Sequence, residues 1–196
     1  MSTIVFPELH RSARYLMRKV YAASETPRPA FGPGRPVDRP GDHWLIEVEA
    51  PAMRAGCGLA FMADIIQGRR TRIRVPQPDI DPGAVGNPTV MGADQTGEQI
   101  TLQGLTPFFA VRKGWFLSIV TEGERYTYQG AAEAVADGDG EVTLPIWPML
   151  MVPHSNGDTV EIAEPWIEGV LVEGGSFEIG RPAAVRPGAF TIEQIL

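Results

Sequence analysis

The chain has 196 residues, of which 43% are hydrophobic and 21% charged, and its formal net charge is −7. These values are typical of a globular protein with one core or two small ones. The single cysteine excludes an intrachain disulfide and a multi-cysteine metal site. The sequence contains no run of about 18 apolar residues, so it predicts no membrane span. Basic residues interrupt the apolar ones within the first twenty positions, which argues against a secretory signal and for cytoplasmic synthesis.

The charges are unevenly distributed along the chain. Residues 1–75 contain 12 Arg and Lys against 7 Asp and Glu, whereas residues 76–196 contain 5 against 17. The net charges are therefore +5 and −12. Such asymmetry suits contacts between copies or with oppositely charged partners, although solvated surfaces would produce it equally well. Because the basic residues lack dense clustering with interleaved aromatics, we expect no specific nucleic acid partner.

The first half of the chain predicts three strands and one helix. Residues 13–23 form the first expected strand, and residues 26–41, with five prolines, form an extended loop or arm. Residues 43–50 alternate so that Trp44, Ile46 and Val48 share one face. The expected helix covers 53–68, and it buries residues at spacings of three and four: Met53, Cys57, Ala60, Phe61 and Ile65. Gly56 and Gly58 should each weaken it by about 1 kcal/mol unless a close neighbour needs the space.

An amphipathic strand follows at 69–75, and a breaker-rich connection at 76–88 coincides with the change of charge sign. Beyond it, short β-like runs alternate with turn signals, which is typical of a small barrel or sandwich. A hairpin turn is expected at 137–140, where glycine supplies positive φ. The expected strands are 89–91, 99–102, 115–120, 125–132, 141–146, 159–162, 166–172, 176–179 and 189–195.

No pattern in the sequence predicts catalysis, a cofactor or a metal. His10, His43 and His154 stand in no ligand spacing, and the acidic turn at 137–141 lacks the register of a calcium loop. Cys57 is expected to be a buried, inert thiol. Paired carboxylates for glycoside hydrolysis converge only in a fold, so the sequence leaves them open. The chain has four tryptophans, Trp44, Trp115, Trp147 and Trp166. They could anchor interfaces, but all four lie in apolar β runs, where packing in the core is the commoner role.

Four stretches carry a resemblance to a known family. They are residues 11–15 (RSARY); 40–44 (PGDHW) leading to 51–53 (PAM); 86–90 (GNPTV) with 92–97 (GADQTG); and 144–148 (LPIWP) followed by 157–160 (GDTV). In this order and spacing, the chain resembles the distal tail protein, or an adjacent tail-tip or hub structural protein, of long-tailed bacteriophages and gene-transfer particles. The resemblance spans most of residues 11–172.

This resemblance implies a mostly β fold with two modules. A β-sandwich-like, ring-forming belt module with one helix would comprise residues 1–85 and 173–196, and a small β-barrel, OB-like or SH3-like, would be inserted at 86–172. It also implies a non-enzymatic virion protein, made in the host cytoplasm, whose homo-oligomeric ring, a hexamer, joins the tail tube to hub, baseplate or fibre proteins. The tape-measure protein would be a further neighbour.

We expect six residues of the basic part to lie at interfaces: Arg14, Arg35, Arg39, Trp44, Arg70 and Arg72. Two alternatives remain at this point. The barrel could be a carbohydrate- or receptor-binding tail module in which Trp115 or Trp147 stacks on a sugar. The chain could instead be a hydrolase that acts on the cell envelope.

Overall fold

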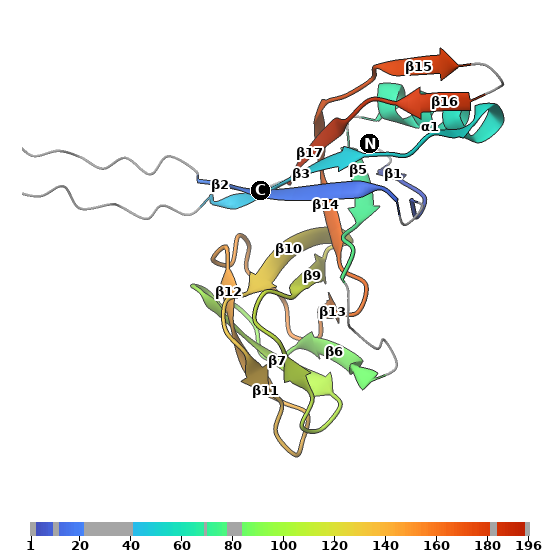
Figure 1. Ribbon diagram of the computed structural model, residues 1–196. Helices are drawn as coiled ribbons and strands as arrows, with labels where there is room; N and C mark the ends of the chain where they lie inside the picture. Colours follow the sequence, from blue (N-terminus) through green and yellow to red (C-terminus); the bar gives the residue numbers. More distant parts are fainter. Residues whose placement is uncertain are drawn as a thin grey trace, which may run out of the picture.

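A computed structural model describes residues 3–9, 12–21, 41–68, 70–77, 84–180 and 184–194. Within these ranges the chain forms seventeen strands and one helix, which confirms the mostly β class. Two bodies follow one another from top to bottom in Figure 1: a six-stranded sheet with the helix above, and a closed barrel below. Of the predicted arm at 26–41, residues 26–40 lie outside the described residues.

The six-stranded sheet combines strands from both ends of the chain. Its order is β1 (Ile4–Val5), β5 (Arg70–Arg74), β14 (Trp166–Glu173), β17 (Phe190–Gln194), β3 (His43–Glu49) and β2 (Arg14–Val20). All neighbours pair antiparallel except β1 and β5. On β3, Trp44, Ile46 and Val48 are all buried, so the predicted alternation is confirmed.

Helix α1 (Ala55–Gln67) packs against one face of this sheet and shares a hydrophobic core with it. A three-stranded sheet lies beside the helix and consists of β15 (Phe177–Gly180), β16 (Ala184–Pro187) and β4 (Met53–Arg54). Its buried residues are Gly58, Phe61, Met62 and Ile65. The predicted stripe was wrong at Cys57 and Ala60, which are exposed. The physical reason is Gly58: a Cβ there would lie 2.5 Å from Cβ of Val185, so the helix turns this glycine, and not Cys57, onto β16.

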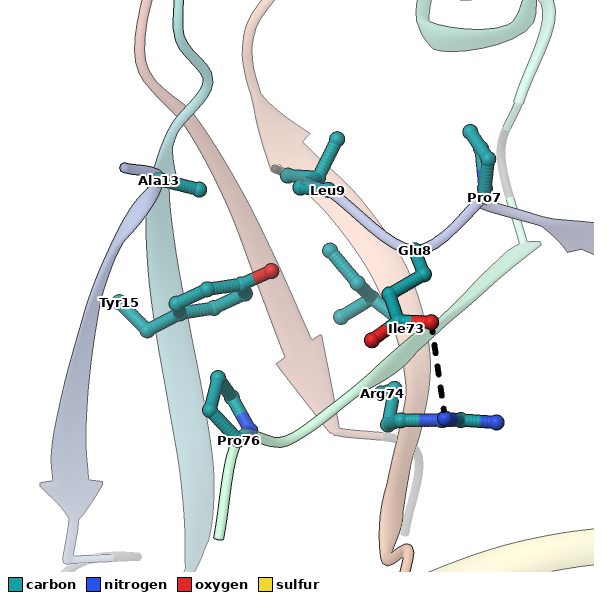
Figure 2. A pocket seen from close by; sticks show the side chains of 8 residues that line it. All are labelled: Pro7, Glu8, Leu9, Ala13, Tyr15, Ile73, Arg74 and Pro76. Atoms are coloured by element: carbon teal, nitrogen blue, oxygen red, sulfur yellow. Dashed lines mark ion pairs between the residues drawn. The ribbon is translucent and has the colours of Figure 1, made fainter. Parts of the chain in front are cut away.

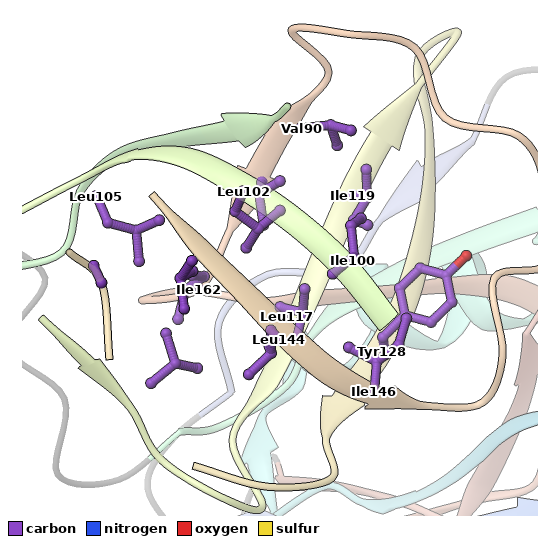
Figure 3. Packing of buried hydrophobic residues seen from close by; sticks show 14 of the residues in the cluster. Val90, Ile100, Leu102, Leu105, Leu117, Ile119, Tyr128, Leu144, Ile146 and Ile162 are labelled. Carbon is purple, nitrogen blue, oxygen red and sulfur yellow. The ribbon is translucent and has the colours of Figure 1, made fainter. Parts of the chain in front are cut away.

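The barrel closes in the order β10 (Glu124–Gly130), β12 (Val142–Trp147), β7 (Gln99–Leu105), β6 (Gly86–Val90), β13 (Thr159–Glu161) and β9 (Phe116–Thr121). Figure 3 shows its interior filled by aliphatic side chains, with Tyr128 at one side of the cluster. Leu102, Leu117, Ile119 and Leu144 have no exposed surface. The barrel is therefore a packed core and a structural unit with its own hydrophobic centre.

A short ribbon of β8 (Ala110–Val111) and β11 (Ala134–Val135) extends the barrel. The predicted turn follows β11, and Gly140 has φ +78° there, yet the flanking strands β11 and β12 pair with other partners and form no hairpin. Strand β14 belongs to the six-stranded sheet, so the chain leaves the barrel after β13 and the predicted boundary at 172 falls inside β14. The apolar run that begins at Trp166 gave no sign of this change of sheet.

The two glycines of α1 give a matched test of the packing. Gly56→Ala should raise the free energy of unfolding by about 0.5–1 kcal/mol, because a Cβ at Gly56 meets no atom within 4 Å and alanine favours the helix. Gly58→Ala should lower it by about 1–3 kcal/mol through overpacking against Val185. Urea denaturation of both variants measures the difference. Equal effects would contradict the close contact between α1 and β16.

Candidate functional site

The connection between the sheet and the barrel contains three of the six side chains that the sequence predicts at interfaces, Trp44, Arg70 and Arg72. The chain enters the barrel after β5 and returns from it into β14, and these two strands are neighbours in the six-stranded sheet. We call the side chains that join the two bodies at this place the junction. The junction is the candidate site because its contacts fix the orientation of the barrel relative to the six-stranded sheet.

A buried carboxylate lies at the centre of the junction. Glu168 is only 2% exposed and stands opposite Arg72 in the pairing of β14 with β5. Its Oε1 accepts a hydrogen bond from Arg70 Nε at 2.9 Å, and its Oε2 accepts two from Arg72, Nε at 2.9 Å and Nη2 at 2.6 Å. Thr3 Oγ1 donates a further bond at 3.2 Å. The charge is thus fully paired, as a buried carboxylate requires.

Arg70 carries this network across to the barrel. Its Nη2 lies 2.8 Å from Oε1 of Glu124, the first residue of β10. The hydrogen bond with Arg70 lowers the pKa of Glu124, and the same bond raises the pKa of Arg70. Arg72 also reaches the barrel, where Gly123 O accepts from its Nη2 at 3.4 Å. One network of ion pairs therefore connects the six-stranded sheet with the barrel.

Aromatic packing forms the other half of the junction. Trp44 of β3 is 7% exposed, and its ring centroid lies 5.2 Å from Phe116 and 4.6 Å from Trp147 of the barrel. Gln77 bonds both backbone groups of Phe116, accepting from N at 2.6 Å and donating to O at 3.1 Å. Thr127 Oγ1 donates to Trp166 O at 2.8 Å. Polar and apolar contacts on both sides thus hold the barrel in one orientation.

The predicted interface residues separate into three groups. The structure brings Trp44, Arg70 and Arg72 together at the junction inside one subunit. Arg14 stays at the surface, with 85% of its side chain exposed and an ion pair of 3.8 Å to Glu49. Arg35 and Arg39 lie outside the described residues.

The acidic partners of these arginines, Glu168 and Glu124, were not predicted from the sequence. Glu168 stands in an apolar run, 96 residues from Arg72, so no local spacing connects them. The available signal was the strand Arg70–Arg74, in which three arginines alternate and need counter-charges from a neighbouring strand.

A second polar cluster, centred on His154, lies inside the barrel. Thr121 Oγ1 donates to Asp158 Oδ2 at 2.6 Å and has no second proton, so His154 Nδ1, at 2.6 Å, must donate to Thr121. His154 Nε2 then accepts from Tyr128 Oη at 3.0 Å, and Tyr128 accepts from Met151 N at 3.2 Å. Burial lowers the pKa of His154 to about 4, although Asp158 opposes the shift. His154 is therefore neutral and both of its ring nitrogens are hydrogen-bonded, which suits bracing of the 148–158 loop.

A surface groove runs beside β2 and β5 (Figure 2). Apolar side chains line most of it, and the Tyr15 hydroxyl points into it. Burial, and then the charge of Glu8, raises the pKa of this phenol. Arg74 at the rim is already paired, with Glu8 at 3.9 Å and Glu164 at 3.0 Å. The groove is therefore suited to an apolar side chain and brings no nucleophile and base together.

No group of three or more His, Cys, Asp or Glu among the described residues is placed to hold a metal ion. No helix in the described part of the chain is long and apolar enough to cross a membrane. In comparisons with known proteins, no family model matches the sequence, and no curated protein matches it either.

The junction can be tested at its buried carboxylate. Glu168→Gln should lower the free energy of unfolding by about 3 kcal/mol, because it leaves Arg70 and Arg72 without a counter-charge in a site with little water. Glu49→Gln, which affects only the exposed pair with Arg14, should change it by less than about 0.5 kcal/mol. Denaturant titration of both variants measures these changes. A similar small effect of both would mean that the network does not hold the two bodies.

The His154 cluster predicts a pH dependence. The folded pKa of about 4 lies below the ordinary value of 6.5, so the unfolded chain binds the proton first on acidification. Stability from this site is therefore complete above pH 6.5 and is lost as the pH falls toward 4. Between pH 7 and 4.5, the wild-type chain should lose about 2 kcal/mol more than His154→Gln does. Urea denaturation at a series of pH values measures the free energy of unfolding of both chains. If this free energy falls equally with pH in the wild type and in His154→Gln, the histidine is not buried in its neutral form.

Proposed function

We propose that this chain is a non-enzymatic structural subunit of a phage tail tip, which forms a ring that joins the tail tube to hub, baseplate or fibre proteins. The proposal takes its family from the resemblance of the four sequence stretches. Its structural support is one surface at the upper end of the molecule, formed by α1 and β15 (Figure 1).

Four large apolar side chains meet solvent on that surface. Leu59 and Ile66 of α1 are 46% and 63% exposed, and Phe177 and Ile179 of β15 are 40% and 66% exposed. We call these four residues the assembly face. Ile179 of β15 pairs with Val185 of β16, so the two side chains point to the same side of the three-stranded sheet. The side chain of Val185 packs on Gly58 of α1, so this is the side on which the helix lies.

The assembly face also includes an open strand edge. Among the described residues, β15 pairs with β16 and with no strand on its other side. Natural proteins usually cover or charge such edges, since free backbone groups beside apolar side chains promote association. Clustered exposed apolar residues likewise mark protein interaction sites. Both observations support a partner chain at this face.

A second, different surface lies on β2, the strand at one end of the six-stranded sheet. Leu16 is 50% exposed there, beside Arg14 and Arg18. A closed ring needs two unlike patches on each copy, because each subunit contacts its neighbours head to tail. The assembly face and the outer edge of β2 supply such a pair.

The carbohydrate-binding alternative receives less support. Trp147 is packed against Trp44 at 4.6 Å and Tyr21 at 6.3 Å between ring centroids. Trp115 lies under Arg112 at 5.7 Å and beside Phe109 at 6.1 Å. A sugar ring needs an open aromatic face, and both side chains are already engaged.

The ring can be tested with the purified chain. The wild type should be oligomeric in native mass spectrometry, whereas the double variant Ile66→Glu, Ile179→Glu should be a folded monomer, because charges at the assembly face oppose burial. Phe108→Ser, which changes an even more exposed apolar residue on the barrel, is the control and should leave the oligomer intact. A monomeric wild type, or a double variant that still assembles, would contradict the proposal.

A further inference from the structure

The barrel ends in an exposed aromatic residue with an unusual backbone conformation. Phe108 is 74% exposed and has φ +62°. We propose that this end of the barrel docks another protein of the same particle, through an apolar pocket bordered by Lys or Arg that receives the Phe108 ring. The inference rests on the proposed function, because it places the partner in the tail.

The conformation of Phe108 is costly for this residue type. Phe109 N donates to Thr106 O at 3.0 Å, which closes a four-residue turn with Pro107 and Phe108 at its centre. Proline at the second position and a positive φ at the third define a type II turn, in which glycine is the favoured third residue. A bulky residue there costs on the order of 1 kcal/mol or more, and such strain gathers at functional sites.

The neighbouring chain holds this turn on several sides. Phe108 N donates to Asp137 O at 3.3 Å, and Ala136 N donates to Phe109 O at 2.9 Å. Asp137 Oδ1 in turn accepts from the backbone N of Asp139 and of Glu141, each at 2.9 Å. The turn is therefore braced by the next loop, and the ring is presented to solvent from a fixed base.

Val135 is a second exposed apolar residue close to this turn. Val135 pairs with Ala110 in the β8 and β11 ribbon, and the continued pairing sets Asp137 opposite Phe108. Strand alternation places the side chain of Val135 on the side opposite the buried Ala136, and it is 54% exposed. We call Phe108, Val135 and the acidic residues Glu133, Asp137 and Asp139 the barrel tip. Figure 1 shows β11 at the end of the barrel away from the six-stranded sheet.

The charges of the barrel tip indicate the chemistry of the partner. Within the described residues, no Lys or Arg forms an ion pair with Glu133, Asp137 or Asp139. Residues 84–165 as a whole contain 3 Arg and Lys against 11 Asp and Glu. This field attracts a basic protein surface and repels nucleic acid and anionic lipid. An aromatic anchor inside an acidic border therefore matches an apolar pocket with basic residues at its edge.

Photo-crosslinking in purified particles tests the docking directly. The probe is p-benzoylphenylalanine, placed at position 108 and, as a control, at the exposed barrel position Glu98. We expect position 108 alone to crosslink to one other particle protein, at a peptide with Lys or Arg beside apolar residues. The double variant Glu133→Lys, Asp139→Lys should reduce the crosslink about fivefold or more, because it reverses the charge at the border.

Phe108→Gly separates docking from stability. Glycine suits the positive φ, so the free energy of unfolding should stay the same or rise, while co-sedimentation of the crosslinked partner with the chain is lost. A variant that unfolds would show that Phe108 has a structural role and overturn the inference. A chain that enters particles but gives no crosslink at 108, or crosslinks only to its own copies, to nucleic acid or to lipid, overturns the docking alone. A chain that enters no particle overturns the proposed function as well.

Discussion

A carboxylate almost without access to water, Glu168, is bound by two arginines of the neighbouring strand, and one of them continues to Glu124 of the barrel. Removing a charge from water is unfavourable unless every lone pair finds a donor, so this arrangement tolerates little displacement. The strands β5 and β14, through which the chain enters and leaves the barrel, are the two that carry it. Together with the packing of Trp44 on Phe116 and Trp147, it gives the two bodies a fixed relation.

Because the two bodies have a fixed relative orientation, the two exposed apolar surfaces are also held at fixed positions relative to each other. The assembly face lies above the six-stranded sheet, and the barrel tip lies at the far end of the molecule. A subunit that binds its own copies at one end and a different protein at the other must hold both ends at a constant distance and angle. The junction provides this, and the two surfaces differ as their proposed partners do: an open strand edge with exposed apolar side chains for a second copy, and an acidic border for a basic protein.

The sequence predicted what depends on local periodicity. The alternation of Trp44, Ile46 and Val48 located β3 and its buried face, and the spacing around Phe61 and Ile65 located α1. Strands of two residues, such as β8 and β11, have too few positions to show a period, so they were missed. Glu168 and its arginines could not be matched because their contact crosses the inserted barrel. Phe108 carried no signal either, since a strained φ is a property of the folded turn.

Cryo-electron microscopy of the purified wild-type chain would show both whether the chain forms a ring and which surface makes the contact. We expect a closed ring in which α1 and β15 of each copy contact the next copy and every barrel points the same way, with the tip free. Single monomers, or a ring whose contacts leave Ile66 and Ile179 in solvent, would contradict this expectation.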